Sequence, residues 1–78
     1  MARNQIKKKL KKILSTFFKK KVKFFSMETV DNWDSLNHLK VLMIIQKKFK
    51  ITLNSNEIAT VTDENKITKL VSEKIYKK

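Results

Sequence analysis

The sequence has no cysteine, no proline and no glycine among its 78 residues. Without cysteine the fold cannot be held by disulfides, and zinc sites built from thiolates are excluded. A single histidine beside scattered carboxylates also argues against a metal site. Without glycine, tight turns that need a positive φ fall to Asn and Asp, which favours helices joined by loose loops over β-hairpins. A chain this short buries only about 60% of its unfolded surface, so we expect one domain over residues 1–78, stabilised by helix packing.

Acidic residues are absent before Glu28, whereas that part of the chain holds Arg3 and nine lysines. The rest carries nine lysines against seven acids, and the whole chain has a formal charge of +12. A basic arm of this kind suggests nucleic acid or an anionic membrane as a partner. The plainer interpretation, which we favour, is that lysine keeps a small domain in solution.

Long apolar runs are missing as well. No segment approaches the length of a membrane span, and no apolar stretch follows the basic N-terminus. We therefore expect no secretory signal and a cytoplasmic location. A mitochondrial targeting segment is a second interpretation of the basic end, but cleavage near Lys20 would remove the first predicted helix.

Apolar residues recur at helical spacing along most of the chain. We expect helices over about 4–18, 35–48, 55–60 and 63–76, with a long loop over 19–34. Asn54 and Thr62 are the expected N-caps of the last two helices. The predicted fold is all-α: a small up-down bundle of three main helices plus one short helix, with a long first loop.

The spacing also predicts which side chains form the core. In the first helix these are Ile6, Leu10, Ile13, Leu14, Phe17 and Phe18. In the second they are Leu36, Leu39, Leu42, Met43, Ile45 and Phe49, with Val41 and Ile44 widening the stripe. In the last they are Ile67, Leu70, Val71 and Ile75. The loop residues Val22, Phe24, Phe25, Met27 and Val30 are expected to tuck beneath the helices.

A short polar motif precedes the second predicted helix. Trp33-Asp34-Ser35-Leu36 places a serine where a long loop becomes a helix. The first amides of a helix have no intrahelical partner, so a phosphate ester on Ser35 would be stabilised there. Taken alone, the motif fits a simple N-cap by Asp34 or Ser35 at least as well.

The residues that follow resemble the acyl carrier protein family. From Ser35 to Phe49 the chain matches the family's pattern without a gap, with Asp-Ser-Leu, alternating apolar residues, Met43 and a closing Phe. The run from Trp33 to Leu39 is similar to stand-alone carriers of bacterial secondary or surface-polysaccharide pathways. The similarity covers about 27–75 and continues at Ile51, Leu53, Glu57, Ile58, Thr62, Lys66, Ile67, Leu70 and Val71. Asn32 and Trp33 depart from the family's usual Gly-Ala pair, and Glu64 stands where an apolar residue is common.

The resemblance implies a carrier that has no catalysis of its own. Ser35, flanked by Asp34 and Leu36, would hold 4′-phosphopantetheine from coenzyme A and carry acyl or aminoacyl groups as thioesters. The arm would supply the thiol that the chain lacks. Leu42, Met43, Ile58 and Val61 are candidates to line an acyl pocket, although each fits ordinary core packing equally well.

The implied partners are a phosphopantetheinyl transferase and a loading ligase, synthase or transferase of fatty-acid or secondary-metabolite biosynthesis. The candidate contact residues are Asn37, Lys40, Met43 and Lys47. Typical carriers present acids on this helix, whereas here Lys40, Lys47 and Lys48 are basic. We therefore expect a cognate partner with an acidic or apolar docking surface, and we expect the carrier itself to be a monomer.

Two other functions are open at this stage. The alternative is a basic helical module that binds nucleic acid or an anionic membrane without a prosthetic group, although no nucleic-acid-binding motif is present. An enzyme would have to use Ser35 and His38, which are helix neighbours at i, i+3, yet no nucleophile elbow surrounds them. We expect His38 to be polar surface near the phosphate.

Overall fold

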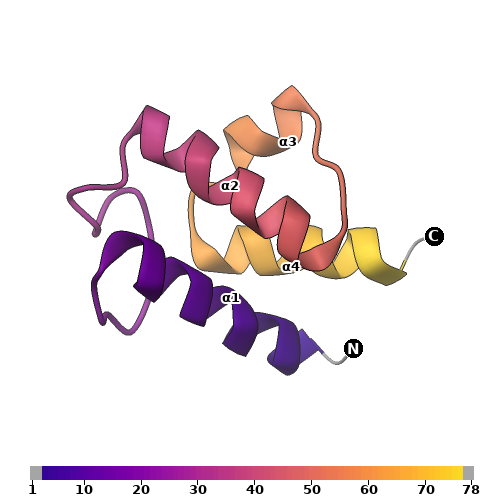
Figure 1. Ribbon diagram of the computed structural model, residues 1–78, viewed down its shortest axis with the longest axis horizontal. Coiled ribbons are helices and arrows are strands. Elements are labelled where there is room, and N and C mark those ends of the chain that lie inside the picture. Colours follow the sequence, from indigo (N-terminus) through magenta and orange to yellow (C-terminus); the bar gives the residue numbers. More distant parts are fainter. Residues whose placement is uncertain (1–2, 77–78) are drawn as a thin grey trace.

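The computed structural model of the protein describes residues 3–76, so residues 1–2 and 77–78 of the expected domain lie outside it. Four helices follow one another: α1 (Arg3–Phe18), α2 (Ser35–Phe49), α3 (Ser55–Thr60) and α4 (Glu64–Tyr76) (Figure 1). Within residues 3–76 there is no β-strand, only an isolated antiparallel bridge between Ser26 and Asp63. The all-α prediction is confirmed for this part of the chain.

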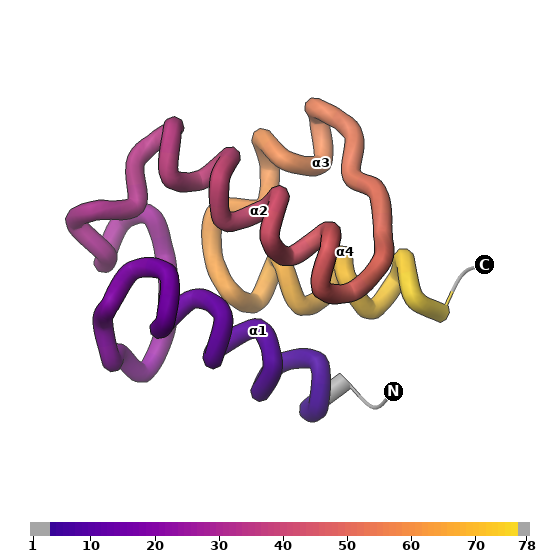
Figure 2. The backbone as a smooth tube through the Cα atoms, in the orientation of Figure 1, coloured from indigo at the N-terminus to yellow at the C-terminus, as the bar shows by residue number. Residues whose placement is uncertain are grey.

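The two long helices α1 and α2 run antiparallel to each other, and α4 lies alongside α1 (Figure 1). The short α3 connects α2 to α4 on the far side of α2 from α1. The tube in Figure 2 shows that the long segment between α1 and α2 folds back around one end of the molecule. The start of α2 therefore lies at that end.

No helix among the described residues combines the length and the apolar character needed to cross a lipid bilayer.

The buried face of α1 follows the expected spacing. Ile6, Leu10, Leu14 and Phe18 are buried at intervals of four residues, while Ile13 and Phe17 pack against the core from its edge. In α4, Ile67 and Val71 are buried, and Leu70 and Ile75 are partly buried. In the long loop, Phe25 and Val30 are buried and Val22 and Met27 are partly buried. The prediction for Phe24 is wrong, because this side chain is 39% exposed.

The buried face of α2 differs from the prediction. Its buried residues are His38, Val41, Leu42 and Ile45, and Phe49 is partly buried. Leu36, Leu39, Met43 and Ile44, all predicted to be core, are exposed. Apolar residues surround most of this helix, so their spacing does not fix which side faces inward. Because His38 lies on the inner face, Leu36, Leu39 and Met43 face solvent.

The helix ends are capped without glycine. Within the described residues, a positive φ occurs at Lys19 and Lys50, which directly follow α1 and α2. The expectation that Asn or Asp would take such positions is therefore wrong. The backbone N–H of Lys50 donates to the carbonyls of Gln46 and Lys47, which closes the last turn of α2. Lysine at a helix C-terminus also complements the negative end of the helix dipole.

The two later helices begin with side-chain caps. Asn54 and Glu57 form a reciprocal capping box at the start of α3, as predicted. At the start of α4, Asp63 rather than Thr62 accepts the hydrogen bond from the Lys66 amide, at 2.8 Å. The Thr62 carbonyl instead accepts a hydrogen bond from the Met27 amide of the long loop.

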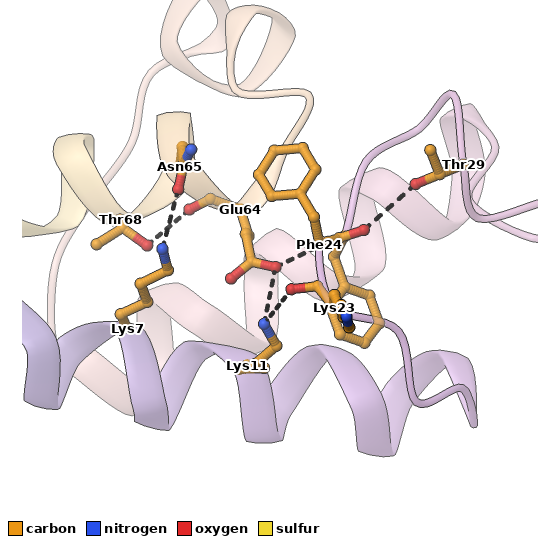
Figure 3. Close-up of polar contacts among 9 residues, drawn as sticks. Lys7, Lys11, Lys23, Phe24, Thr29, Glu64, Asn65 and Thr68 are labelled. Atoms are coloured by element: carbon orange, nitrogen blue, oxygen red, sulfur yellow. Dashed lines mark hydrogen bonds and ion pairs between the residues drawn. The ribbon is translucent and has the colours of Figure 1, made fainter.

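One buried carboxylate ties the long loop to the helices. Glu64 is 1% exposed, and its Oε1 accepts a hydrogen bond from the Phe25 amide at 2.8 Å. Lys11 of α1 forms an ion pair with the same oxygen at 3.4 Å and also donates to the carbonyl of Lys23 (Figure 3). The Glu64 amide in turn donates to the Phe25 carbonyl. Backbone groups of the loop and Lys11 thus partner the buried Glu64.

Candidate functional site

Ser35 is the first residue of α2, and its side chain is exposed. Asp34 precedes it in an extended conformation, and the Asp34 carboxylate accepts a hydrogen bond from the Asn37 amide at 2.9 Å. The His38 amide donates to the Asp34 carbonyl. Among the described residues, the amides of Ser35 and Leu36 have no acceptor. Two free N–H groups and the positive end of the helix dipole thus lie beside the serine hydroxyl.

The segment before Ser35 is fixed by side-chain amides. The Asn32 side chain donates to the carbonyl of Phe18 at the end of α1, at 3.2 Å. The Asn37 side chain donates to the Asn32 carbonyl at 2.8 Å. This partly buried amide therefore holds the loop. Together the two bonds hold the start of α2 against the end of α1.

Trp33 and His38 form a buried pair beneath the serine. The Trp33 ring stacks on Phe18, with ring centroids 4.9 Å apart. Its indole N–H donates to Nδ1 of His38 at 2.9 Å, and Nε2 of His38 lies 2.6 Å from the carbonyl oxygen of Ile58. Since Nδ1 accepts, the ring proton resides on Nε2 and is donated to Ile58.

This arrangement corrects the expectation that His38 lies on the surface. The residue is only 6% exposed, because both ring nitrogens have partners inside the protein. Neither nitrogen is left to activate Ser35, so the residues do not assemble a nucleophile and base.

A shallow hollow of about 470 Å³ adjoins Ser35 between α2 and α3. It is lined by Met27, Ser35, His38, Leu39, Ser55, Ile58, Ala59 and Thr62. Most of its surface is apolar. The hollow is open to solvent.

Of the four residues expected to line an acyl pocket, only Ile58 borders this hollow. Leu42 and Val61 are buried in the core, and Met43 is 60% exposed. Leu39 borders the hollow although it was assigned to the core. Its position one turn after Ser35 is the sequence signal that places it on the same side of α2.

The exposed side of α2 is apolar and basic. Leu36, Leu39 and Met43 form an exposed stripe at helical spacing, which we call the α2 stripe. Lys40, Lys47 and Lys48 are also exposed on this helix. Since α2 contains no acidic residue, every formal charge on its exposed surface is positive.

Two acidic side chains near the site have lowered pKa values. The pKa of Asp31 is lowered by a hydrogen bond from its own backbone amide and by Lys20, which lies 3.4 Å away. The pKa of Glu57 in α3 is lowered by the hydrogen bond from the Asn54 amide and by Lys74 of α4, at 2.9 Å. The Glu57–Lys74 ion pair connects α3, one wall of the hollow, to α4.

No protein-family model matches the chain, and a search of curated proteins finds no significant sequence relative.

Proposed function

We propose that the protein carries acyl or aminoacyl groups as thioesters on 4′-phosphopantetheine attached to Ser35. The observation that carries this proposal is the setting of Ser35: an exposed hydroxyl on the first residue of a 15-residue helix, beside an apolar hollow. The similarity of the Trp33–Phe49 segment to acyl carrier proteins adds the identity of the group. The same setting on an unrelated sequence would suggest only an N-terminal cap.

The residues around Ser35 suit a phosphodiester. The free amides of Ser35 and Leu36 point along the helix axis, where a negative phosphate is stabilised. Asp34 does not compete for these two amides, because its carboxylate accepts from Asn37. Attachment would form a bond from Ser35 Oγ to phosphorus and release the adenosine bisphosphate half of coenzyme A. The transferase would remove the hydroxyl proton, since His38 is engaged by Trp33 and Ile58.

The hollow offers a place for the arm or a short cargo. Met27, Leu39, Ile58 and Ala59 supply apolar contact, and the hydroxyls of Ser55 and Thr62 are available at its edge. When bound, the arm supplies the thiol for thioester formation. The chain itself would orient the arm and shield its base from water.

The α2 stripe and its lysines support docking to a partner enzyme whose surface is apolar with acidic residues around it. Complementary charge raises association rates, and facing like charges lower them. A transferase or ligase with a basic docking surface should therefore recognise this protein poorly.

The alternative of a basic module acting without a prosthetic group has less support. The apolar face of α1 is used inside the protein, where Ile6, Leu10, Leu14 and Phe18 are buried. This helix therefore retains no broad apolar face with which to enter a bilayer.

The decisive experiment is intact-mass analysis after incubation with coenzyme A, Mg²⁺ and a phosphopantetheinyl transferase of broad specificity. We expect the mass to increase by one phosphopantetheine group in the wild type and not in Ser35→Ala. Ser55→Ala is the matched control, because Ser55 is exposed, begins a helix and lines the same hollow. Ser55→Ala should gain the group. If several transferases leave the wild type unchanged, the proposal is overturned.

A further inference from the structure

A second, larger groove lies between α1 and α2. Its volume is about 630 Å³, and its lining is mostly apolar. It is lined by Lys9, Lys12, Ile13, Thr16, Phe17, Ile44 and Lys48. None of these residues belongs to the hollow beside Ser35. The groove is therefore a separate feature that the carrier function does not require.

Lysines from both helices line the groove. Lys9 and Lys12 come from α1, and Lys48 comes from α2, which runs antiparallel to α1 (Figure 1). The apolar side chains of the lining come from the same two helices. Ammonium groups and apolar side chains thus border one open groove.

No ion pair among the described residues neutralises these three lysines. Neither α1 nor α2 contains an acidic residue. Among the described residues, Lys9, Lys12 and Lys48 take part in no ion pair, whereas Lys11 of the same helix is paired with Glu64. An anionic group in the groove would therefore meet lysines with no competing acid on either helix.

We propose that this groove binds a phosphate monoester with a single alkyl chain. The phosphate would lie among Lys9, Lys12 and Lys48, and the chain would lie along Ile13, Phe17 and Ile44. A phosphate monoester carries about −1.5 to −2 charges at pH 7 and offers three acceptor oxygens, which suits three ammonium groups better than a carboxylate with one charge.

The shape of the groove favours a single chain over a bilayer. Ile13 and Phe17 line it and are partly buried against the core, so they do not project toward a flat membrane. A concave apolar site flanked by charge instead takes one ligand from solution and covers much of its surface.

The test is a titration of the full-length protein with dodecyl phosphate, below the concentration at which it forms micelles, followed by NMR of the backbone amides. We expect saturable shifts over residues 9–17 and 44–48. The triple variant Lys9→Gln/Lys12→Gln/Lys48→Gln should bind at least about tenfold more weakly, because each lysine removed takes away a charge-assisted contact. The matched control is Lys21→Gln/Lys66→Gln/Lys69→Gln, which removes the same charge from exposed positions outside the groove and should keep most of the affinity.

Further measurements test whether the phosphate and the alkyl chain both contribute to binding. Butyl phosphate should bind far more weakly than dodecyl phosphate, and dodecanoate should fall between them. Ile44→Ser should reduce the preference for the longer chain without affecting the fold, because Ile44 is already exposed.

Four results would overturn the proposal: equal weakening in both triple variants, equal affinity for butyl and dodecyl phosphate, shifts confined to other residues, or binding to phosphatidylglycerol vesicles alone. Ser35→Ala should bind dodecyl phosphate as the wild type does. The result of the titration therefore does not depend on modification at Ser35.

Discussion

The indole N–H of Trp33 donates a hydrogen bond to Nδ1 of His38 at 2.9 Å, and the opposite ring nitrogen of His38 lies 2.6 Å from the Ile58 carbonyl oxygen. The imidazole thereby connects the end of the long loop, the first turn of α2 and the middle of α3. His38 and Ile58 both line the hollow beside Ser35. The geometry of that hollow consequently depends on the hydrogen bonds of His38.

We expect the His38 ring to be the Nε2–H tautomer, because Nδ1 must accept from Trp33. The ¹⁵N chemical shifts of the ring measure this directly. A proton on Nδ1 near neutral pH would contradict the hydrogen-bond arrangement.

Replacing His38 with Ala should destabilise the protein by about 1–3 kcal/mol, since a buried donor and a buried acceptor lose their partner. Urea unfolding measures the change. Asn56→Ala, at an exposed position of α3, is the control and should shift the free energy of unfolding by less than about 0.5 kcal/mol.

Two leucines of α2 should differ sharply in their contribution to stability. Leu42 is fully buried, so Leu42→Ala should cost about 2–5 kcal/mol. Leu39 is 50% exposed, and Leu39→Ala should cost less than about 1 kcal/mol. Thermal melts of the two variants make the comparison, and equal losses would mean that the inner face of α2 is misassigned.

Lys50 should be a site where glycine stabilises the fold. Its φ of 54° and ψ of 49° are left-handed, a conformation that costs a residue with a Cβ about 1–2 kcal/mol. Lys50→Gly should therefore raise the free energy of unfolding by up to about 1 kcal/mol. Lys48→Gly, inside α2, should lower it by about 1 kcal/mol, and denaturant melts of both variants test the contrast.

The hydrogen bond from the Asn54 amide to Glu57, together with the contact to Lys74, should make stability depend on pH. The pKa of Glu57 is lowered in the folded protein, so its contribution is present above the unfolded pKa and is lost as the pH falls through the folded pKa. The stability difference between wild type and Glu57→Gln should accordingly shrink on acidification below about pH 4.5. A difference that stays constant through this pH range would contradict the prediction.

Local signals predicted part of this fold well. The buried face of α1 follows from apolar residues separated by lysines, and the start of α3 follows from Asn54 and Glu57, which are three residues apart. Both depend on interactions within one turn or one face of a helix. In α2, apolar residues occur on nearly every side, so the inward direction is decided by Trp33 and Ile58, which lie in other segments.

The sequence predicted the position of Ser35 but not the hollow beside it. The position of Ser35 at the start of α2 follows from the Asp34 cap. The hollow beside it depends on how α3 and the long loop approach α2, which no spacing within one helix encodes. The sequence likewise marked Glu64 only as an unusual residue. Its contacts were not predictable, because its partners Phe25 and Lys11 are distant in sequence.

The Glu64 contacts have a consequence for the order of assembly during synthesis. The loop residue Phe25 is held by a side chain that follows it by 39 positions in the chain, and Met27 bonds to the backbone just before α4. A ribosome therefore releases α1, the loop and α2 before the segment that anchors the loop exists. We expect nascent chains that end before α4 to leave this loop open to proteases, because the side chain that holds Phe25 has not yet been made.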